Sequence, residues 1–247
     1  MPESQPEGSG SSITSKVSLI NFGNPALDRG IGGVPLPSLM LVEGPNDSGK
    51  SVLCQQLAFG ATEMGLSIRY ITTENTFSTL VKQMDELSYN VTKNVISGKF
   101  SITTLHTQGL PWNAALASLY LETMSRFILE DKSTLIVIDS LTSVAAQATP
   151  DSVLGFFAGL RDSLDQTNRC IVVTLHPYAL VSDLLVRIRS MCDGHLVLSI
   201  RESRGKLLKS LEISKLRGAK MKSMGSLTFD VEPDIGIKVS PLTSMKG

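Results

Sequence analysis

Residues 44–51 constrain the fold of this chain more than any other stretch. They read Gly-Pro-Asn-Asp-Ser-Gly-Lys-Ser, which matches the phosphate-loop pattern G-x-x-x-x-G-K-[ST]. The apolar run 39–42 precedes the pattern, and apolar residues at helical spacing follow it. A chance turn could match so short a pattern, but a strand before it and a helix after it are the context that a phosphate loop requires. The stretch therefore predicts an α/β nucleotide-binding fold.

The residue types in this loop suit the binding of phosphates. Gly44 and Gly49 allow backbone angles at which successive N–H groups turn inward, and the helix that follows adds its positive dipole end. Lys50 can reach the β- and γ-phosphates, so we expect it to serve both binding and catalysis, and the Ser51 hydroxyl can bind Mg²⁺. The predicted binding residues are Gly44, Pro45, Asn46, Asp47, Ser48, Gly49, Lys50, Ser51 and Val52.

The remaining pattern predicts a mostly parallel central sheet flanked by helices. Expected strands are 17–20, 39–42, 67–72, 100–105, 134–138 and 170–175, and expected helices are 76–87, 112–129, 152–167 and 183–191. Residues 30–35 read as a glycine-rich turn. On helix 112–129 we expect Leu116, Leu119, Tyr120, Met124, Phe127 and Ile128 to face inward. Residues 195–200, 207–214, 226–231 and 235–239 predict antiparallel strands that extend one edge of the sheet.

Length and composition limit the class of protein. The 247 residues suit a single domain over 16–247, preceded by a disordered tail over 1–15 that is rich in Ser, Pro, Gly and Glu. With 23 basic and 23 acidic residues, net charge gives no argument for nucleic-acid binding. Three scattered cysteines, no secretory signal and no apolar run of about 20 residues favour a cytoplasmic protein that meets the membrane only through partners.

Two carboxylates follow predicted strands, where ligands bind in open parallel sheets. Asp139 ends the run Leu-Ile-Val-Ile-Asp, so it is a candidate to hold Mg²⁺ beside Ser51; the alternative is an acid that caps the next turn. Glu74 follows strand 67–72 and could polarise the water that attacks the γ-phosphate. The alternative for Glu74 is an acid that only stabilises the start of a helix.

Three further residues are weaker candidates. His176 ends strand 170–175 and could sense the γ-phosphate, or it could simply be satisfied by a neighbouring loop. Lys215 and Arg217 lie at a strand end in a basic region. In a monomer they would be a solvated turn, whereas in a ring such residues can reach the nucleotide of the neighbouring subunit.

Together these motifs resemble RecA-like ATPases of the KaiC type, over nearly the whole stretch 27–239. The matching pieces are 44–51, Glu74, 138–140 and 215–218. More closely, five stretches resemble the KaiC-like nucleotide-binding proteins of the archaeal flagellum (archaellum) motor: 44–51, 72–76, 175–178, 185–190 and 231–237. The resemblance implies a RecA-like fold, ATP with Mg²⁺, and a homo-oligomer, typically a hexameric ring. It also implies partners, namely the motor ATPase, the membrane platform protein and a scaffold ring, and it implies that Lys215 and Arg217 act in trans.

One departure from the family pattern bears on activity. Active KaiC-type domains carry two adjacent glutamates after the strand that corresponds to residues 67–72. This chain instead has Glu74 followed by Asn75. We therefore expect a regulatory ring subunit that binds ATP and hydrolyses it slowly or not at all. The alternatives are an active KaiC-like ATPase or autokinase, which depends on Glu74, and a RecA-like recombinase, for which no basic and aromatic DNA-binding loop is evident.

Overall fold

The structure, a computed structural model, describes residues 18–105, 109–203, 206–218 and 225–240. Its centre is a nine-stranded sheet in the order β11-β10-β9-β8-β3-β7-β6-β4-β5. The parallel part comprises β3 (Ser38–Glu43), β4 (Ile68–Thr72), β5 (Phe100–Thr104), β6 (Leu135–Asp139) and β7 (Cys170–Leu175), and β8 (Gly194–Ser203) pairs parallel to β3. The predicted mostly parallel sheet is confirmed.

The antiparallel extension is also confirmed. β9 (Lys206–Leu216) pairs with β8, β10 (Ser226–Glu232) pairs with β9, and β11 (Gly236–Ser240) forms the edge. Since β8 lies directly beside β3, this extension joins the parallel sheet at the strand that leads into the phosphate loop. The expected disordered tail, residues 1–15, lies outside the described residues.

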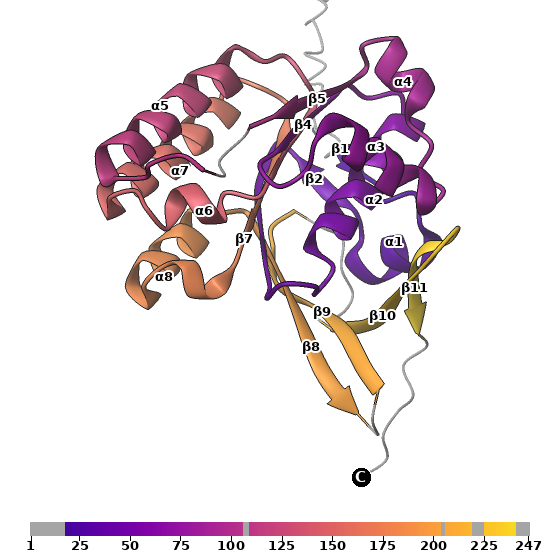
Figure 1. Ribbon diagram of the computed structural model, residues 1–247. Coiled ribbons are helices and arrows are strands. Elements are labelled where there is room, and N and C mark those ends of the chain that lie inside the picture. The colour runs from indigo at the N-terminus through magenta and orange to yellow at the C-terminus, as the bar shows by residue number, and fades with distance from the viewer. Residues whose placement is uncertain (1–17, 106–108, 204–205, 219–224, 241–247) are drawn as a thin grey trace, which may run out of the picture.

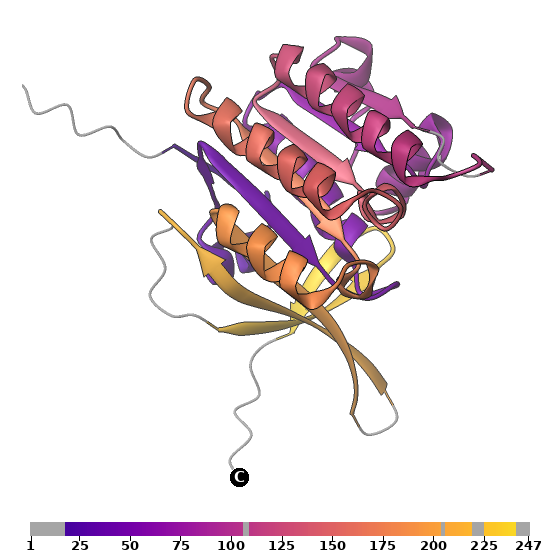
Figure 2. The same cartoon turned by 90° about the vertical axis from the view of Figure 1, so that its left-hand side faces the viewer.

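Helices cover both faces of the sheet (Figures 1 and 2). One face carries α1 (Pro25–Ile31), α2 (Lys50–Glu63), α3 (Phe77–Glu86) and α4 (Thr92–Ile96), and the other carries α5 (Ala114–Glu130), α6 (Thr142–Ala145), α7 (Pro150–Leu164) and α8 (Ser182–Met191). A short 3-10 helix, η1 (Pro177–Ala179), follows β7. Alternate residues of β3 enter the two cores: Met40 and Val42 pack on the α2 side, and Leu39 and Leu41 on the α5–α8 side. A strand with two buried faces reads as a continuous apolar run, as residues 39–42 do.

Several elements differ from the expectation. Residues 30–35 were expected to form a glycine-rich turn, but residues 30 and 31 belong to α1. This helix begins after Asn24, whose side chain accepts hydrogen bonds from Ala26 N (3.1 Å) and Leu27 N (3.3 Å). The helix ends at Gly32, whose φ of 85° only glycine adopts easily. β2 (Val34–Leu36) then pairs with β1 (Ser18–Ile20) in a separate two-stranded sheet, and α4 was not anticipated.

The inward face predicted for α5 was partly wrong. Leu119 and Phe127 are 56% and 38% exposed, and the fully buried positions are Ala117, Leu121, Met124 and Ile128. These four follow i, i+4, i+7, i+11 spacing, so they form the stripe that contacts the neighbouring elements. The Phe127 ring instead supports the guanidinium of Arg69, whose Cζ lies 5.4 Å from the ring centre.

Helix α2 approaches the β1–α1 connection very closely at Gly60. A Cβ placed on Gly60 would lie 2.3 Å from the carbonyl oxygen of Asn21 and 2.3 Å from the carbonyl carbon of Phe22. One turn earlier, Gln56 Nε2 donates a hydrogen bond of 2.8 Å to Phe22 O. The contact fixes the helix that carries Lys50 and Ser51 at its start.

Candidate functional site

The phosphate loop joins β3 to α2 in the predicted way. Gly44 N donates to Leu175 O (3.3 Å), which ties the start of the loop to the end of β7. A Cβ on Gly44 would lie 2.5 Å from Ser48 Oγ and 2.9 Å from Leu198 O, so only glycine fits. Gly49 precedes α2 with φ 97°, a left-handed conformation that also favours glycine. Both glycines of the motif are thus explained by local geometry.

Lys50 lies folded over its own loop. Its Nζ donates to the carbonyl oxygens of Gly44 (2.9 Å) and Pro45 (2.8 Å). Burial lowers the pKa of the Lys50 ammonium, while the carboxylates of Asp139 and Glu74 oppose that shift. A partly desolvated cation that is hydrogen-bonded to neutral carbonyl groups gains a stronger interaction when an anion such as a phosphate arrives.

Asp139 is buried at the end of β6 and is surrounded by hydroxyl groups. Tyr70 OH donates to Oδ2 (2.8 Å), while Ser51 Oγ (3.2 Å) and Thr174 Oγ1 (3.0 Å) donate to Oδ1. Burial raises the pKa of Asp139, although these hydrogen bonds lower it, and the nearby Glu74 carboxylate raises it further. The predicted neighbours Ser51 and Asp139 are therefore in direct contact.

These two side chains fit a magnesium ion. Mg²⁺ prefers oxygen ligands, keeps several waters, and commonly takes only one or two carboxylates together with substrate phosphates. Ser51 Oγ and the Asp139 carboxylate supply such oxygens side by side, and a divalent cation would offset the cost of burying the Asp139 charge. Within the described ranges, no group of three or more His, Cys, Asp or Glu side chains is placed to form an all-protein metal site.

Glu74 is held near Asp139 by Ser140, the residue that follows β6. Ser140 Oγ donates to Glu74 Oε1 (2.8 Å), and Thr73 Oγ1 donates to Ser140 O (2.8 Å). Glu74 N and Asn75 N both approach Thr72 Oγ1, at 3.4 and 3.1 Å. Glu74 thus lies at the site rather than serving only as a helix acid, because α3 begins three residues later with Thr76 as its cap.

A cavity of about 750 Å³ connects these residues. Its lining includes Lys50, Ser51, Glu74 and Asp139, and His176 also reaches it from the end of β7. The ring of His176 accepts a hydrogen bond at Nδ1 from Tyr178 N (3.3 Å), so part of the local-loop alternative holds as well. The lining residues are Asn46, Asp47, Gly49, Lys50, Ser51, Val52, Thr73, Glu74, Asp139, Ser140, Thr142, Ser143, His176 and Lys209.

Lys209 was not predicted as a site residue. It belongs to β9, which the sequence identifies only as a strand in a basic region, and the β8–β9 hairpin brings its side chain to the cavity. Tyr70 and Thr174 were also missed, because their contacts with Asp139 depend on the pairing of β4, β6 and β7. The available signal for Lys209 was a lysine on the same strand face as two apolar residues, Leu207 and Leu211.

A second cavity, of about 720 Å³, lies beside the first and shares Ser51, Val52 and Glu74 with it. Apolar walls come from Val52, Leu87, Val231 and Pro233, and polar groups come from Gln55, Asn75, Gln83, Glu86 and Asp234. Gln55 is 2% exposed, and its Oε1 accepts no hydrogen bond from the part of the chain that the structure describes. An unpaired buried carbonyl is costly, so this cavity has the character of a binding site for a ligand that donates a hydrogen bond.

Glu43 lies between the apolar run 39–42 and the phosphate loop, and no role was predicted for it from the sequence. It is 1% exposed and accepts two hydrogen bonds from Arg189 of α8, at 2.9 Å (Nε to Oε1) and 2.5 Å (Nη2 to Oε2). His195 Nε2 lies 3.4 Å from Glu43 Oε1. Burial alone would raise the pKa of Glu43, but the hydrogen bonds and charges of Arg189 and His195 bring it down to about 2.

Glu43 predicts a specific loss of stability in acid. Since its folded pKa of about 2 is below the ordinary value of 4.5, its contribution of about 3 kcal/mol is complete above pH 4.5 and lost as the pH falls toward 2. Urea unfolding at pH 7, 5 and 3 should show that Glu43→Gln reduces this acid-dependent loss. Glu122→Gln, which removes an exposed ion pair with Arg126, is the matched control and should leave the pH profile unchanged. Equal pH profiles for Glu43→Gln and the wild type would contradict the assignment.

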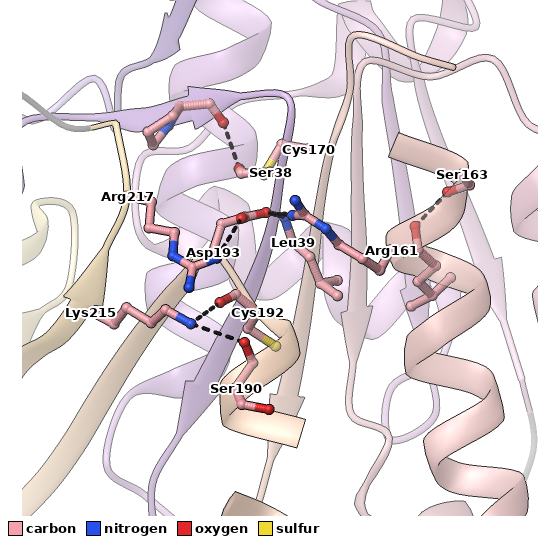
Figure 3. Close-up of polar contacts among 12 residues, drawn as sticks. Ser38, Leu39, Arg161, Ser163, Cys170, Ser190, Cys192, Asp193, Lys215 and Arg217 are labelled. Carbon is pink, nitrogen blue, oxygen red and sulfur yellow. Dashed lines mark hydrogen bonds and ion pairs between the residues drawn. The ribbon is translucent and has the colours of Figure 1, made fainter. Parts of the chain in front are cut away.

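Lys215 and Arg217 lie at the other end of the sheet, away from the phosphate loop. Lys215 lies near the end of β9, paired with His195, and Arg217 is the first residue after the strand. The neighbouring Gly194 pairs with Met40 near the start of β3. Lys215 Nζ donates to carbonyl oxygens of Arg189 (3.2 Å), Ser190 (3.2 Å) and Cys192. Figure 3 shows Arg217 beside Asp193, with 3.9 Å between Nη1 and Oδ1. The fold brings the other predicted site residues together but not these two.

Comparison with known proteins agrees with this arrangement. A family model described as "ATPase: KaiC" matches residues 20–244. The archaeal flagellar ATP-binding protein FlaH of Sulfolobus acidocaldarius is 35% identical over 225 residues, covering 91% of this chain and 98% of that protein. The protein of the same name from Methanocaldococcus jannaschii is 28% identical over 225 residues, covering 89% and 94%.

Two solved structures share the fold. The flagellar accessory protein FlaH from Methanocaldococcus jannaschii superposes with a TM-score of 0.78 at 26% identity, covering 92% of this chain and all of that one. A KaiC-like protein from Pyrococcus horikoshii has a TM-score of 0.73 at 23% identity and covers 91% of this chain. The second likeness concerns the fold alone. Among the described residues, no helix is long and apolar enough to cross a membrane.

Proposed function

Because the chain belongs to the KaiC family of ATPases, we propose that it is an ATP-binding regulatory subunit of the archaeal flagellum motor, forming a ring with the nucleotide between neighbouring subunits. The observation that carries the proposal is the single cavity on which Lys50, Ser51, Glu74 and Asp139 converge. The biological setting comes from the relatives, which are named archaeal flagellar ATP-binding proteins. The partners would be the motor ATPase, the membrane platform protein and a scaffold ring, so membrane contact would come only through them.

The two adjoining cavities suggest how ATP would lie. The triphosphate would occupy the first, with the loop N–H groups and Lys50 at the phosphates and Mg²⁺ between Ser51 and Asp139. The base and ribose would extend into the second, between Val52 and Pro233, within reach of the unpaired Gln55 amide. When bound, the magnesium ion would neutralise phosphate charge; the loop, Lys50 and Asp139 would position the nucleotide.

Ring formation is supported by the position of Arg217. It lies at the opposite end of the sheet from the phosphate loop, so it cannot reach its own nucleotide but could reach that of a neighbour in a head-to-tail ring. A nucleotide bound at a subunit interface stabilises the assembled state by linkage. Such a ring would change its affinity for a partner according to the bound nucleotide.

Slow hydrolysis is favoured by Asn75, which stands where active relatives have a second glutamate. The competing function, an active ATPase or autokinase, is favoured by the hydrogen bond from Ser140 that holds Glu74 at the cavity. Glu74→Gln separates them, since it removes the candidate base while retaining a side chain of the same shape.

The proposal is tested by light scattering of the purified protein. With ATP and Mg²⁺ we expect the mass to rise to that of a closed ring, and without nucleotide we expect smaller species. Under the same conditions, phosphate release should be slower than about one turnover per minute, well below ordinary enzyme rates. If the mass of the particles were the same with and without ATP, the proposed ATP-dependent ring would be contradicted. Rapid turnover that Glu74→Gln abolishes would favour the enzyme instead.

A further inference from the structure

Asp193 occupies the junction between β8 and the start of β3. Its backbone N donates to Leu39 O (2.8 Å), its Oδ2 accepts from Leu39 N (3.0 Å), and its own carbonyl accepts from Arg217 N (3.0 Å). The residue is 8% exposed. Asp193 is therefore fixed to the central strand on one side and to the residue after β9 on the other (Figure 3).

Two arginines face this carboxylate, and they are held differently. Arg161 of α7 makes a close ion pair with Oδ2 through Nη1 and is partly covered. Arg217 stands 3.9 Å from Oδ1, and its side chain is 63% exposed. If Arg217 leaves, Asp193 keeps both Arg161 and the Leu39 N–H, so no unpaired buried charge remains. An exposed pair at this distance contributes little, so Arg217 is easily released.

Lys215 is committed to its own subunit. Its three ammonium hydrogens match the three carbonyl oxygens at the end of α8. One of these belongs to Arg189, which binds Glu43 before the phosphate loop. The two residues of the predicted trans-acting pair therefore differ in how strongly their own subunit holds them. Lys215 is hydrogen-bonded to the end of α8, whereas the exposed Arg217 side chain can move away from Asp193.

The distance to the subunit's own nucleotide is large. Five residues of extended chain separate Leu39, which contacts Asp193, from Gly44 at the loop, which is about 16 Å along the strand. An arginine side chain cannot cross that distance. A guanidinium anchored here can meet a phosphate only on another subunit, where it would gain charge-assisted, bidentate hydrogen bonds.

We propose that Asp193 is a positioning residue for Arg217: it holds the guanidinium at rest and releases it to the terminal phosphate of the nucleotide on the neighbouring subunit. The proposal rests on the proposed function, because it requires ATP at a subunit interface. Arg217 supplies the positive charge at the phosphate, and Asp193 sets the ATP concentration at which Arg217 leaves it and neighbouring subunits assemble.

The test measures the ATP concentration that gives half-maximal ring assembly, by light scattering with Mg²⁺. Arg217→Ala should raise this midpoint by about tenfold or more, since charge-assisted contacts to phosphate are lost. Asp193→Asn should lower it by about threefold, because the competing exposed ion pair is gone. In the double variant the Asp193 effect should vanish and the midpoint should equal that of Arg217→Ala. Arg187→Ala, an exposed arginine on α8, is the matched control and should leave the midpoint unchanged.

Two further measurements, on an Asp193→Glu variant and on a mixture of variants, test the same proposal. If Asp193→Asn does not fold, Asp193→Glu keeps the charge and brings it closer to Arg217, which should raise the midpoint about threefold only when Arg217 is present. Mixing Arg217→Ala subunits with Lys50→Ala subunits should restore assembly in part, because at every second interface of an alternating ring one subunit supplies an intact site and the other an intact arginine. An Asp193 effect of equal size with and without Arg217 would overturn the proposal. If the wild type itself neither binds ATP nor assembles, it is the proposed function that fails.

Discussion

Replacing Lys50 with alanine is expected to weaken ATP binding by about a hundredfold or more and to abolish ATP-dependent assembly. The variant loses charge-assisted hydrogen bonds to phosphate, each contributing about 1.5–3 kcal/mol, and a tenfold change in affinity corresponds to 1.4 kcal/mol. The fold should be retained, because the Lys50 side chain lines the cavity and its Nζ bonds two carbonyl oxygens of its own loop, those of Gly44 and Pro45. Titration calorimetry with ATP and Mg²⁺ measures the affinity directly.

A lysine outside the site provides the comparison. Lys93→Ala, on the exposed helix α4, removes the same side chain and should leave ATP affinity unchanged. Thermal unfolding of both variants in the absence of nucleotide shows whether either has lost its fold. If Lys50→Ala bound ATP as tightly as the wild type, the phosphate-loop assignment and the proposed ring would both be untenable.

Gly60→Ala is expected to destabilise the protein by about 3 kcal/mol, at the upper end of the cost of overpacking. The new methyl group would lie 2.3 Å from Asn21 O, and backbone cannot move aside as a flexible side chain can. Since α2 carries Lys50 and Ser51, its displacement should weaken ATP binding as well. For a chain of this size the melting temperature should fall by roughly 6–12 °C.

Gly155→Ala is the matched control, because this exposed glycine lies within α7 and a Cβ there would meet nothing within 4 Å. Alanine is the better helix former, so this variant should gain about 0.5–1 kcal/mol. Both values come from urea unfolding at neutral pH. If both variants changed stability in the same direction, the close approach at Gly60 would not control the packing of α2.

The sequence predicted the parts of the site that depend on short, contiguous patterns. The phosphate loop, Asp139 after an apolar strand and Glu74 after another are local features, and the carboxyl ends of parallel strands meet at one edge whatever the details of packing. The alternation of strands and helices, and the antiparallel strands near the end, followed from periodicity in the same way.

Other features depend on how distant segments meet, and no local pattern encodes that. Tyr70 and Thr174 share the Asp139 carboxylate because β4, β6 and β7 are neighbours in a particular register. Lys209 reaches the cavity through the β8–β9 hairpin. The buried face of α5 differs from the predicted one, because contacts with neighbouring elements determine which side of the helix is buried, not the number of large apolar residues on it.

The position of β3 in the middle of the sheet has a consequence for how the protein is made. Cys170, beside Ser38, comes 132 residues later in the chain, and Asp193, beside Leu39, comes 154 residues later. A ribosome therefore releases the phosphate loop long before β7 and β8, the two strands that enclose it. Contacts so distant in sequence form slowly, and an incomplete sheet exposes unpaired strand edges that promote aggregation. The two cavities also take Lys209 from β9 and Val231 from β10, so the candidate site is complete only after these late strands have been synthesised.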